Sequence, residues 1–165
     1  MVQGDFGDAP AVARTLAEAD AVINCVGYAK GVPPSTYGEG MRHVIAAMDA
    51  RGVSRLVSIS GAGLEMDGDA SGLGRRIIIG LLKTLAKDVL DAKRLEWEVI
   101  RDSDVAWTLG RVARMVEKPG RGSVEVALDR VSGSPMVPYP DVAAWMLDQL
   151  ESDEFLRAAP FVSGA

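Results

Sequence analysis

The stretch Arg55–Gly63, "RLVSISGAG", decides the fold that we expect for this chain. Leu56, Val57 and Ile59 form a nearly continuous apolar run, which is typical of a strand buried on both faces of a parallel sheet. Ser60 ends this run, ahead of glycines whose backbone can approach a ligand closely. Ligands of open α/β sheets bind beyond the carboxyl ends of the strands, so Ser60 is a candidate for chemistry. The alternative is that it only begins a turn or caps a helix.

The composition indicates one domain over residues 1–165. Of these residues, 48% are hydrophobic and 25% are charged, a balance typical of folded rather than disordered chains. The net charge of −5 argues against a surface for nucleic acid or an anionic membrane, because binding phosphates needs clustered Lys and Arg. We therefore expect neither nucleic acid nor a membrane among the partners.

Cysteine and histidine each occur once. Cys25 alone allows no internal disulfide and favours a reducing compartment, and with His43 as the only histidine no Cys/His metal cluster is expected. We interpret Cys25, inside an apolar run, as inert packing. The first twenty residues lack the basic start of a signal peptide, and no apolar run is long enough to span a bilayer. These features predict a cytoplasmic protein without a metal site.

Strands and helices are predicted to alternate through the first 60 residues. This alternation predicts an α/β fold, with right-handed crossovers and a parallel sheet. The predicted segments are a strand over 2–6, a helix over 8–16 with Asp8 as its N-cap, a strand over 21–27, a helix capped by Ser35 or Thr36 and ended by Gly52, and the strand over 56–60.

The second half is predicted to begin with a mobile, acidic, glycine-rich loop over 64–74. Trp107 and Trp145 fall at apolar positions of regular elements and are predicted to be core. The predicted segments are a helix over 76–101 that buries Ile78, Leu81, Leu82, Leu85, Val89 and Leu90, strands starting at Ala106, at Ser123 and at Phe161, and a helix starting at Pro140.

These segments resemble, in order, those of a known family. The family is the atypical short-chain dehydrogenase/reductase group, in its NmrA-like and flavin/biliverdin-IXβ-reductase-like branch, and the resemblance runs through nearly the whole chain. The stretches that carry it are Gly4-Asp5-Phe6, the strand ending at Gly27, "GMRHVIAAMDARGV" (Gly40–Val53), the strand ending at Ser60, "SDVAWTLGR" (Ser103–Arg111), Asp141-Val142-Ala143 and "RAAPFVSG" (Arg157–Gly164).

The resemblance implies a Rossmann-like sheet with helices on both faces, an NAD or NADP cofactor and a small-molecule substrate. It implies that Asp5 and its neighbour meet the adenine and that Ser60 hydrogen-bonds near the nicotinamide. The implied catalytic residues are Ser60 and Lys93. The implied cofactor-binding residues are Asp5, Phe6, Val26, Gly27, Ser58, Ile59, Ser60, Gly110, Arg111 and Val112.

The chain departs from this family at its start. The family opens with a strand, a G-x-x-G-x-x-G turn and a helix, then a second strand, and the turn holds the cofactor diphosphate on backbone N–H groups. The sequence contains no such turn, so that roughly 40 residues, on the order of one βαβ unit, lack a counterpart. Neither Gly61-x-Gly63 nor Gly72-x-Gly74 has the full spacing. We therefore expect an N-terminally truncated domain.

The same departure leaves the strand over 21–26 at a sheet edge, and such an edge invites pairing with another chain. Three alternatives account for the missing unit: a truncated gene product, a partner strand or second copy that completes the sheet, or a rearranged sheet.

A second departure from the family concerns catalysis. Short-chain dehydrogenases place a tyrosine four residues before a lysine, whereas Val89 precedes Lys93 at that spacing.

Two functions of different classes follow from the resemblance. The first is an NAD(P)-dependent oxidoreductase that reduces a flavin-like or other small aromatic acceptor. The second is a non-catalytic, NmrA-like redox-sensing or interaction protein, or an inactive remnant. Arg111 has two alternatives as well, because it can face the cleft or make an internal salt bridge. We interpret His43 as structural, and Tyr28 and Tyr37 as candidates for lining the cleft.

Overall fold

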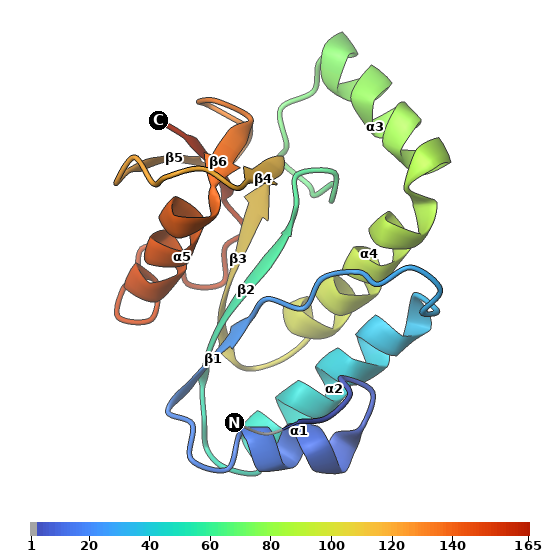
Figure 1. Ribbon diagram of the computed structural model, residues 1–165, viewed down its shortest axis with the longest axis vertical. Helices are drawn as coiled ribbons and strands as arrows, with labels where there is room; N and C mark the ends of the chain where they lie inside the picture. The colour runs from blue at the N-terminus through green and yellow to red at the C-terminus, as the bar shows by residue number, and fades with distance from the viewer. Residues whose placement is uncertain (1–2) are drawn as a thin grey trace.

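The computed structural model describes residues 3–165, and its main feature is a five-stranded sheet with helices on both faces (Figure 1). The strands are β1 (Ala21–Asn24), β2 (Arg55–Gly61), β3 (Ala106–Val112), β4 (Arg114–Val116), β5 (Val124–Ala127), β6 (Met136–Pro138) and β7 (Phe161–Gly164). The helices are α1 (Ala9–Thr15), α2 (Ser35–Asp49), α3 (Leu73–Leu85), α4 (Lys87–Arg101) and α5 (Tyr139–Asp148).

The strand order of the main sheet is β1-β2-β3-β7-β5, and all neighbours are parallel except β5 with β7. β4 and β6 form a separate two-stranded sheet. Asn24 lies opposite Ser58, and Ser60 lies opposite Arg111, so polar residues are aligned across three strands near their carboxyl ends. The prediction of a parallel, Rossmann-like sheet with helices on both faces is confirmed, as is the position of β1 at an edge.

Alternate residues of β2 enter two separate cores. Leu56 packs with side chains of α2 and α4, whereas Val57 and Ile59 pack with α5 on the opposite face. Trp107 belongs to the first core and Trp145 to the second, and both are buried as predicted. Since side chains alternate between the faces of a strand, Ser58 and Ser60 lie on the α4 face with Leu56.

The predicted strand over residues 2–6 is wrong for the part that the structure describes. Gln3 to Asp5 have no regular structure, Phe6 lies in a turn, and Val2 lies outside the described residues. The Asp5 carboxylate accepts a hydrogen bond from the backbone N–H of Gly7 at 2.7 Å, which fixes a turn instead. Phe6 then packs so closely on Gly40 that a Cβ there would come within 2.2 Å of its ring.

The predicted helix over residues 76–101 is two helices, α3 and α4, separated at Ala86, whose backbone is not helical (φ −132°, ψ 33°). α3 extends away from the sheet, while α4 packs along it (Figure 1). Most of the residues predicted as buried in this segment are exposed, and no part of the chain within residues 3–165 covers the outer side of α3. The exposed residues are Ile78, Leu81 and Leu85 on α3 and Val89 on α4, and Leu73 and Ile77 of α3 are exposed with them.

Asp8 is the N-cap residue of α1 as predicted, although its side chain makes no capping hydrogen bond. Two smaller predictions differ from the structure. Neither Ser35 nor Thr36 caps α2, because Pro34 occupies the N-cap position. Cys25 is exposed rather than packed, since it follows the last residue of β1. Among residues 3–165, no helix is long and apolar enough to cross a membrane.

Candidate functional site

A buried polar cluster lies on the α4 face of the sheet, near the carboxyl ends of β1 and β2. The Asn24 amide donates to the Ser58 hydroxyl at 2.9 Å, and its carbonyl oxygen accepts from the backbone N–H of Val26 at 3.2 Å. Asn24 is buried although β1 is an edge strand. Its side chain therefore ties the end of β1 both to β2 and to the loop that follows.

Lys93 joins this cluster from α4. Its Nζ donates to the carbonyl oxygen of Val26 at 2.7 Å and to Glu96 Oε2 at 2.6 Å. Only 12% of the Lys93 side chain is exposed, so it is not a solvated surface lysine. Lys93 instead holds the backbone at Val26, which is one of the residues predicted to bind the cofactor.

Glu96 is the counter-ion of Lys93 and is 3% exposed. Burial raises the pKa of the Glu96 carboxyl above its ordinary value, and Lys93 and Asn24 partly oppose this by lowering the pKa. Its Oε1 has no hydrogen-bond partner. The structure thus keeps a carboxylate with one unsatisfied oxygen close to the carboxyl end of β1.

Ser60 has the second unsatisfied polar atom of this region. It is 7% exposed, and its buried Oγ has no hydrogen-bond partner. A buried hydroxyl without a partner costs free energy, on the order of 1–3 kcal/mol, unless something else bonds to it. Ser60 therefore neither caps a helix nor closes a turn through its hydroxyl, and it stays a candidate for contact with a ligand.

Arg111 makes the internal salt bridge that the sequence left as one of two alternatives. Its Nη1 lies 2.8 Å from Asp69 Oδ1 and donates to the carbonyl oxygen of Leu64, while Nε donates to that of Ala159 and Nη2 to that of Leu128. Burial lowers the pKa of the guanidinium, and Asp69 opposes this. Asp69 also pairs with Arg75 at 2.7 Å. The glycine-rich loop predicted to be mobile is thus fastened to β3 through Asp69.

The predicted cofactor residues fall into separate groups. Asp5, Phe6 and Val26 line a common groove of about 350 Å³ beside β1. Ser58, Ser60 and Arg111 lie on the α4 face of the sheet. The side chains of Ile59 and Val112 lie in the core on the opposite face, and a Cβ on Gly110 would meet the ring of Trp145 at 2.5 Å. Those three residues can contact a ligand on the α4 face only through their backbone.

Tyr28 lies in the loop after β1, and Tyr37 lies in the first turn of α2 and contacts that loop. The Tyr37 hydroxyl accepts a hydrogen bond from the backbone N–H of Ala29 at 2.6 Å, and its ring lies 5.7 Å from that of Tyr28. Tyr37 is buried, so it supports this loop rather than lining an open cleft. Gly27, at the start of the loop, is exposed and has open space where a Cβ would lie.

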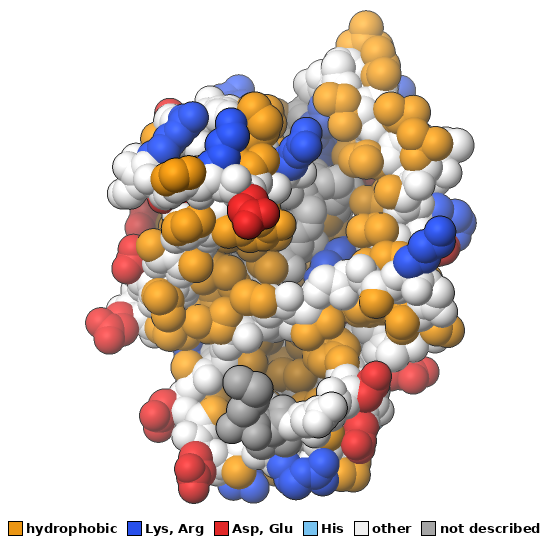
Figure 2. Space-filling model, in the orientation of Figure 1, with side chains coloured by type: hydrophobic (Ala, Val, Ile, Leu, Met, Phe, Trp, Pro, Cys, Tyr) orange, Lys and Arg blue, Asp and Glu red, His pale blue; other side chains and the backbone are white. Residues whose placement is uncertain are grey.

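A cavity of about 560 Å³ lies beyond the carboxyl ends of β2 and β3, beneath α3. Ala62, Gly63 and Ala113, which follow those two strands, form its floor. Figure 2 shows a hollow between α3 and the part of the molecule that contains β4, β5 and β6. This is the edge at which open α/β sheets bind their ligands.

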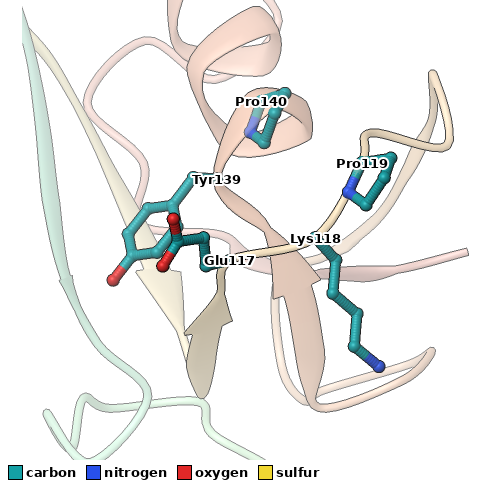
Figure 3. A pocket seen from close by; sticks show the side chains of 5 residues that line it. All are labelled: Glu117, Lys118, Pro119, Tyr139 and Pro140. Carbon is teal, nitrogen blue, oxygen red and sulfur yellow. The ribbon is translucent and has the colours of Figure 1, made fainter.

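A further cavity lies away from the polar cluster, between the end of β4 and the start of α5 (Figure 3). In the figure the Glu117 side chain lies beside the Tyr139 ring, and Lys118 points away from both. The residues lining this cavity follow β4 or begin α5, whereas the cavity beneath α3 is lined by residues that directly follow β2 and β3. We therefore do not place the functional site there.

The sequence did not single out Asn24, Glu96, Asp69 or Arg75 as site residues. Glu96 stands three residues after Lys93, a spacing that places two side chains on one helix face, and this was the one available signal. Asp69 and Arg111 are 42 residues apart, and no local pattern relates them.

A parallel sheet covered by helices, with buried polar residues at its carboxyl edge, defines a Rossmann-like nucleotide-binding protein. The family model described as NAD(P)H-binding matches residues 1–153, so this chain belongs to the NAD(P)H-binding family. The cofactor of this family is NAD or NADP, and the shared fold of the solved neighbours is consistent with the resemblance to atypical short-chain dehydrogenases/reductases.

Solved structures share the fold at low sequence identity. The anaerobillin reductase ChuY from Escherichia coli O157:H7 has a TM-score of 0.78 at 18% identity, and the match covers 98% of this chain and 73% of that one. A short-chain dehydrogenase/reductase from Veillonella parvula in complex with NADP has a TM-score of 0.75 at 18% identity, covering 98% and 70%. The oxidoreductase ylbE from Lactococcus lactis has a TM-score of 0.76 at 18% identity, covering 99% and 71%.

Residues 3–165 fit only part of an NAD(P) molecule. The groove beside β1, which Asp5, Phe6 and Val26 line, has room for one end of it. The diphosphate, however, needs several free backbone N–H groups at a strand-turn-helix. At the start of α2 the N–H groups of Thr36 and Tyr37 already donate to Pro33 and Pro34, and the sequence has no G-x-x-G-x-x-G turn. No diphosphate cradle is therefore present in the described residues.

Proposed function

We propose that this protein is an NAD(P)H-dependent reductase of a flavin-like or other small aromatic acceptor, acting at the carboxyl ends of β2 and β3. The observation that carries the proposal is Ser60, whose buried hydroxyl has no partner where ligands of such sheets bind. In enzymes of this kind the cofactor supplies the hydride, and the protein positions it against the acceptor. Ser60 donates a hydrogen bond to the bound molecules, and Lys93 positions the loop at Val26.

Cofactor binding is the first step to test. We expect calorimetric titration of the 165-residue chain with NADPH and with NADH to give a dissociation constant in the micromolar range for one of them. This requires that another element, such as a second copy or a partner strand at the edge of β1, replaces the glycine-rich turn. Absence of binding by a folded sample would contradict the proposal for this chain.

A substitution at Ser60 tests the proposed chemistry. We expect Ser60→Ala to lower the rate of hydride transfer from NADPH to a flavin or quinone on the order of 100-fold, as loss of one aligned hydrogen-bond donor does elsewhere. Stopped-flow absorbance of NADPH measures this rate. Ser54→Ala is the matched control, because Ser54 is exposed and lies just before β2. An unchanged rate in Ser60→Ala would remove this serine from the mechanism.

A non-catalytic, NmrA-like redox-sensing or interaction role is the second candidate. It is favoured by the lack of a diphosphate cradle in the described residues and by Val89 in place of a tyrosine four residues before Lys93. The two candidates separate in one assay. Cofactor binding without any hydride transfer to flavin or quinone would support the sensor, whereas turnover would exclude it.

A further inference from the structure

The cavity beneath α3 has apolar walls and a cationic residue at its side. Ile78, Ile79 and Leu82 line it from α3, and Phe161 lines it from β7. The charged side chains in its lining are Arg75 and Arg130, and no acidic residue lines it. A flat apolar molecule can therefore lie along these walls with a guanidinium within reach.

The charge of Arg75 is only partly balanced by its own ion pair. Asp69 is shared between Arg75 and Arg111, so that one carboxylate faces two guanidinium groups. Asp69 and Arg111 are 4% and 2% exposed, and water therefore screens their interaction little. Arg75 lines the cavity, and 26% of its side chain is exposed. The three side chains together carry one positive charge in excess, and Arg75 is the one of them that lines the cavity.

The second arginine adds no comparable excess. Arg130 lies 3.7 Å from Asp129, and its side chain is 68% exposed, so its charge is both paired and screened by water. The positive charge at the cavity is a local feature, because the chain as a whole carries a net charge of −5. A bound anion is consequently selected by Arg75 and not by the overall field of the protein.

We propose that this cavity binds a flat apolar molecule bearing a carboxylate, phosphate or sulfonate group, and that Arg75 receives the anionic group. The identification of this molecule as the acceptor rests on the proposed reductase function. The binding site itself rests on the cavity and on the triad of Arg111, Asp69 and Arg75. Guanidinium groups suit such anions because their fork of N–H donors can make two parallel hydrogen bonds.

A pair of fluorescent probes tests the charge requirement without any cofactor. 1-Anilinonaphthalene-8-sulfonate is the anionic probe, and N-phenyl-1-naphthylamine has the same rings without the sulfonate. We expect Arg75→Gln to weaken binding of the anionic probe about tenfold, as loss of one charge-assisted hydrogen bond does, and to leave binding of the neutral probe unchanged. Fluorescence titration gives both dissociation constants.

Two variants serve as controls. Arg76→Gln removes the same charge from an exposed neighbour on α3 that does not line the cavity, and it should leave both probes unaffected. Arg75→Lys keeps the charge and should retain most of the affinity for the anionic probe. Thermal unfolding of each variant shows whether the fold is intact, since this anionic probe also binds unfolding chains.

The outcomes separate the site from the proposed reaction. Equal losses of affinity for the anionic probe in Arg75→Gln and Arg76→Gln would overturn the anion site. Equal losses of affinity for both probes in Arg75→Gln would overturn it as well. Selective loss for the anionic probe in Arg75→Gln would support it. Absence of hydride transfer alongside that selective loss would contradict the reductase and leave the binding site standing.

Discussion

Asp69→Ala is expected to lower the free energy of unfolding by about 3–5 kcal/mol, which is typical when one partner of a buried ion pair is removed. The reason is the remaining charge. Arg111 is 2% exposed, and without the Asp69 carboxylate its guanidinium has no counter-ion in the triad. The Arg75 guanidinium then faces Arg111 directly across the vacated position. Urea unfolding followed by circular dichroism measures the loss as a lower midpoint at unchanged slope.

A matched control and a double variant make this expectation specific. Asp67→Ala removes an exposed carboxylate from the same loop and should leave the midpoint unchanged. Combining Asp69→Ala with Arg111→Met removes both buried charges and should restore part of the loss, because apolar replacements of a buried pair are often tolerated. If Asp69→Ala were no more destabilising than Asp67→Ala, the pair would not fasten the loop to β3.

The strands at the centre of the sheet were predictable because their pattern is local. β2 and β3 are apolar runs stopped by Gly or polar residues, and the parallel order follows from the helices between them. The division between α3 and α4 was not predictable, because alanine, found at position 86, favours helix and gives no stop signal. Periodicity also marked an apolar side on α3 without telling whether the chain itself would cover it.

The residues of the candidate site also differ in how far the sequence could predict them. Ser60 was predictable because it directly ends a recognisable strand, and the resemblance placed Lys93 on the following helix. The role of Lys93 was not predictable, because its two partners, the Val26 carbonyl and Glu96, come together only in the folded chain. Arg111 stayed undecided for the same reason, since Asp69 lies in a loop whose composition indicated mobility instead of a buried carboxylate.

Lys93→Met is expected to be the other strongly destabilising substitution, with a loss of about 3–5 kcal/mol near pH 8. The variant leaves Glu96, 3% exposed, without its counter-ion. Lys87→Met is the matched control on the same helix, because Lys87 pairs with Asp91 at the exposed surface, and it should leave stability unchanged. Lys93→Met combined with Glu96→Gln removes the orphaned charge and should recover much of the loss.

The pH dependence of this loss has a definite sign. The pKa of Glu96 lies above its ordinary value of 4.5 in the folded chain, and removing Lys93 takes away its largest opposing influence. Between the unfolded and the folded pKa the folded state binds more protons, so stability falls as the pH rises through this range. We therefore expect Lys93→Met to cost least near pH 4 and most near pH 8. A loss independent of pH would contradict the assignment of the cost to Glu96.

Cys25 provides a local readout of the same substitution, because it is the only cysteine, is exposed and precedes Val26. Although the residue is exposed, its thiol is partly desolvated, which raises its pKa, and the positive charge of Lys93 opposes this. Without that charge the pKa of Cys25 rises further, and at pH 8 less of the reactive thiolate is present. Alkylation by iodoacetamide should therefore be slower in folded Lys93→Met than in the parent and unchanged in Lys87→Met. A faster reaction would instead mean that the loop at Val26 has opened. The alkylation rate therefore distinguishes the loss of the Lys93 charge from a displacement of this loop.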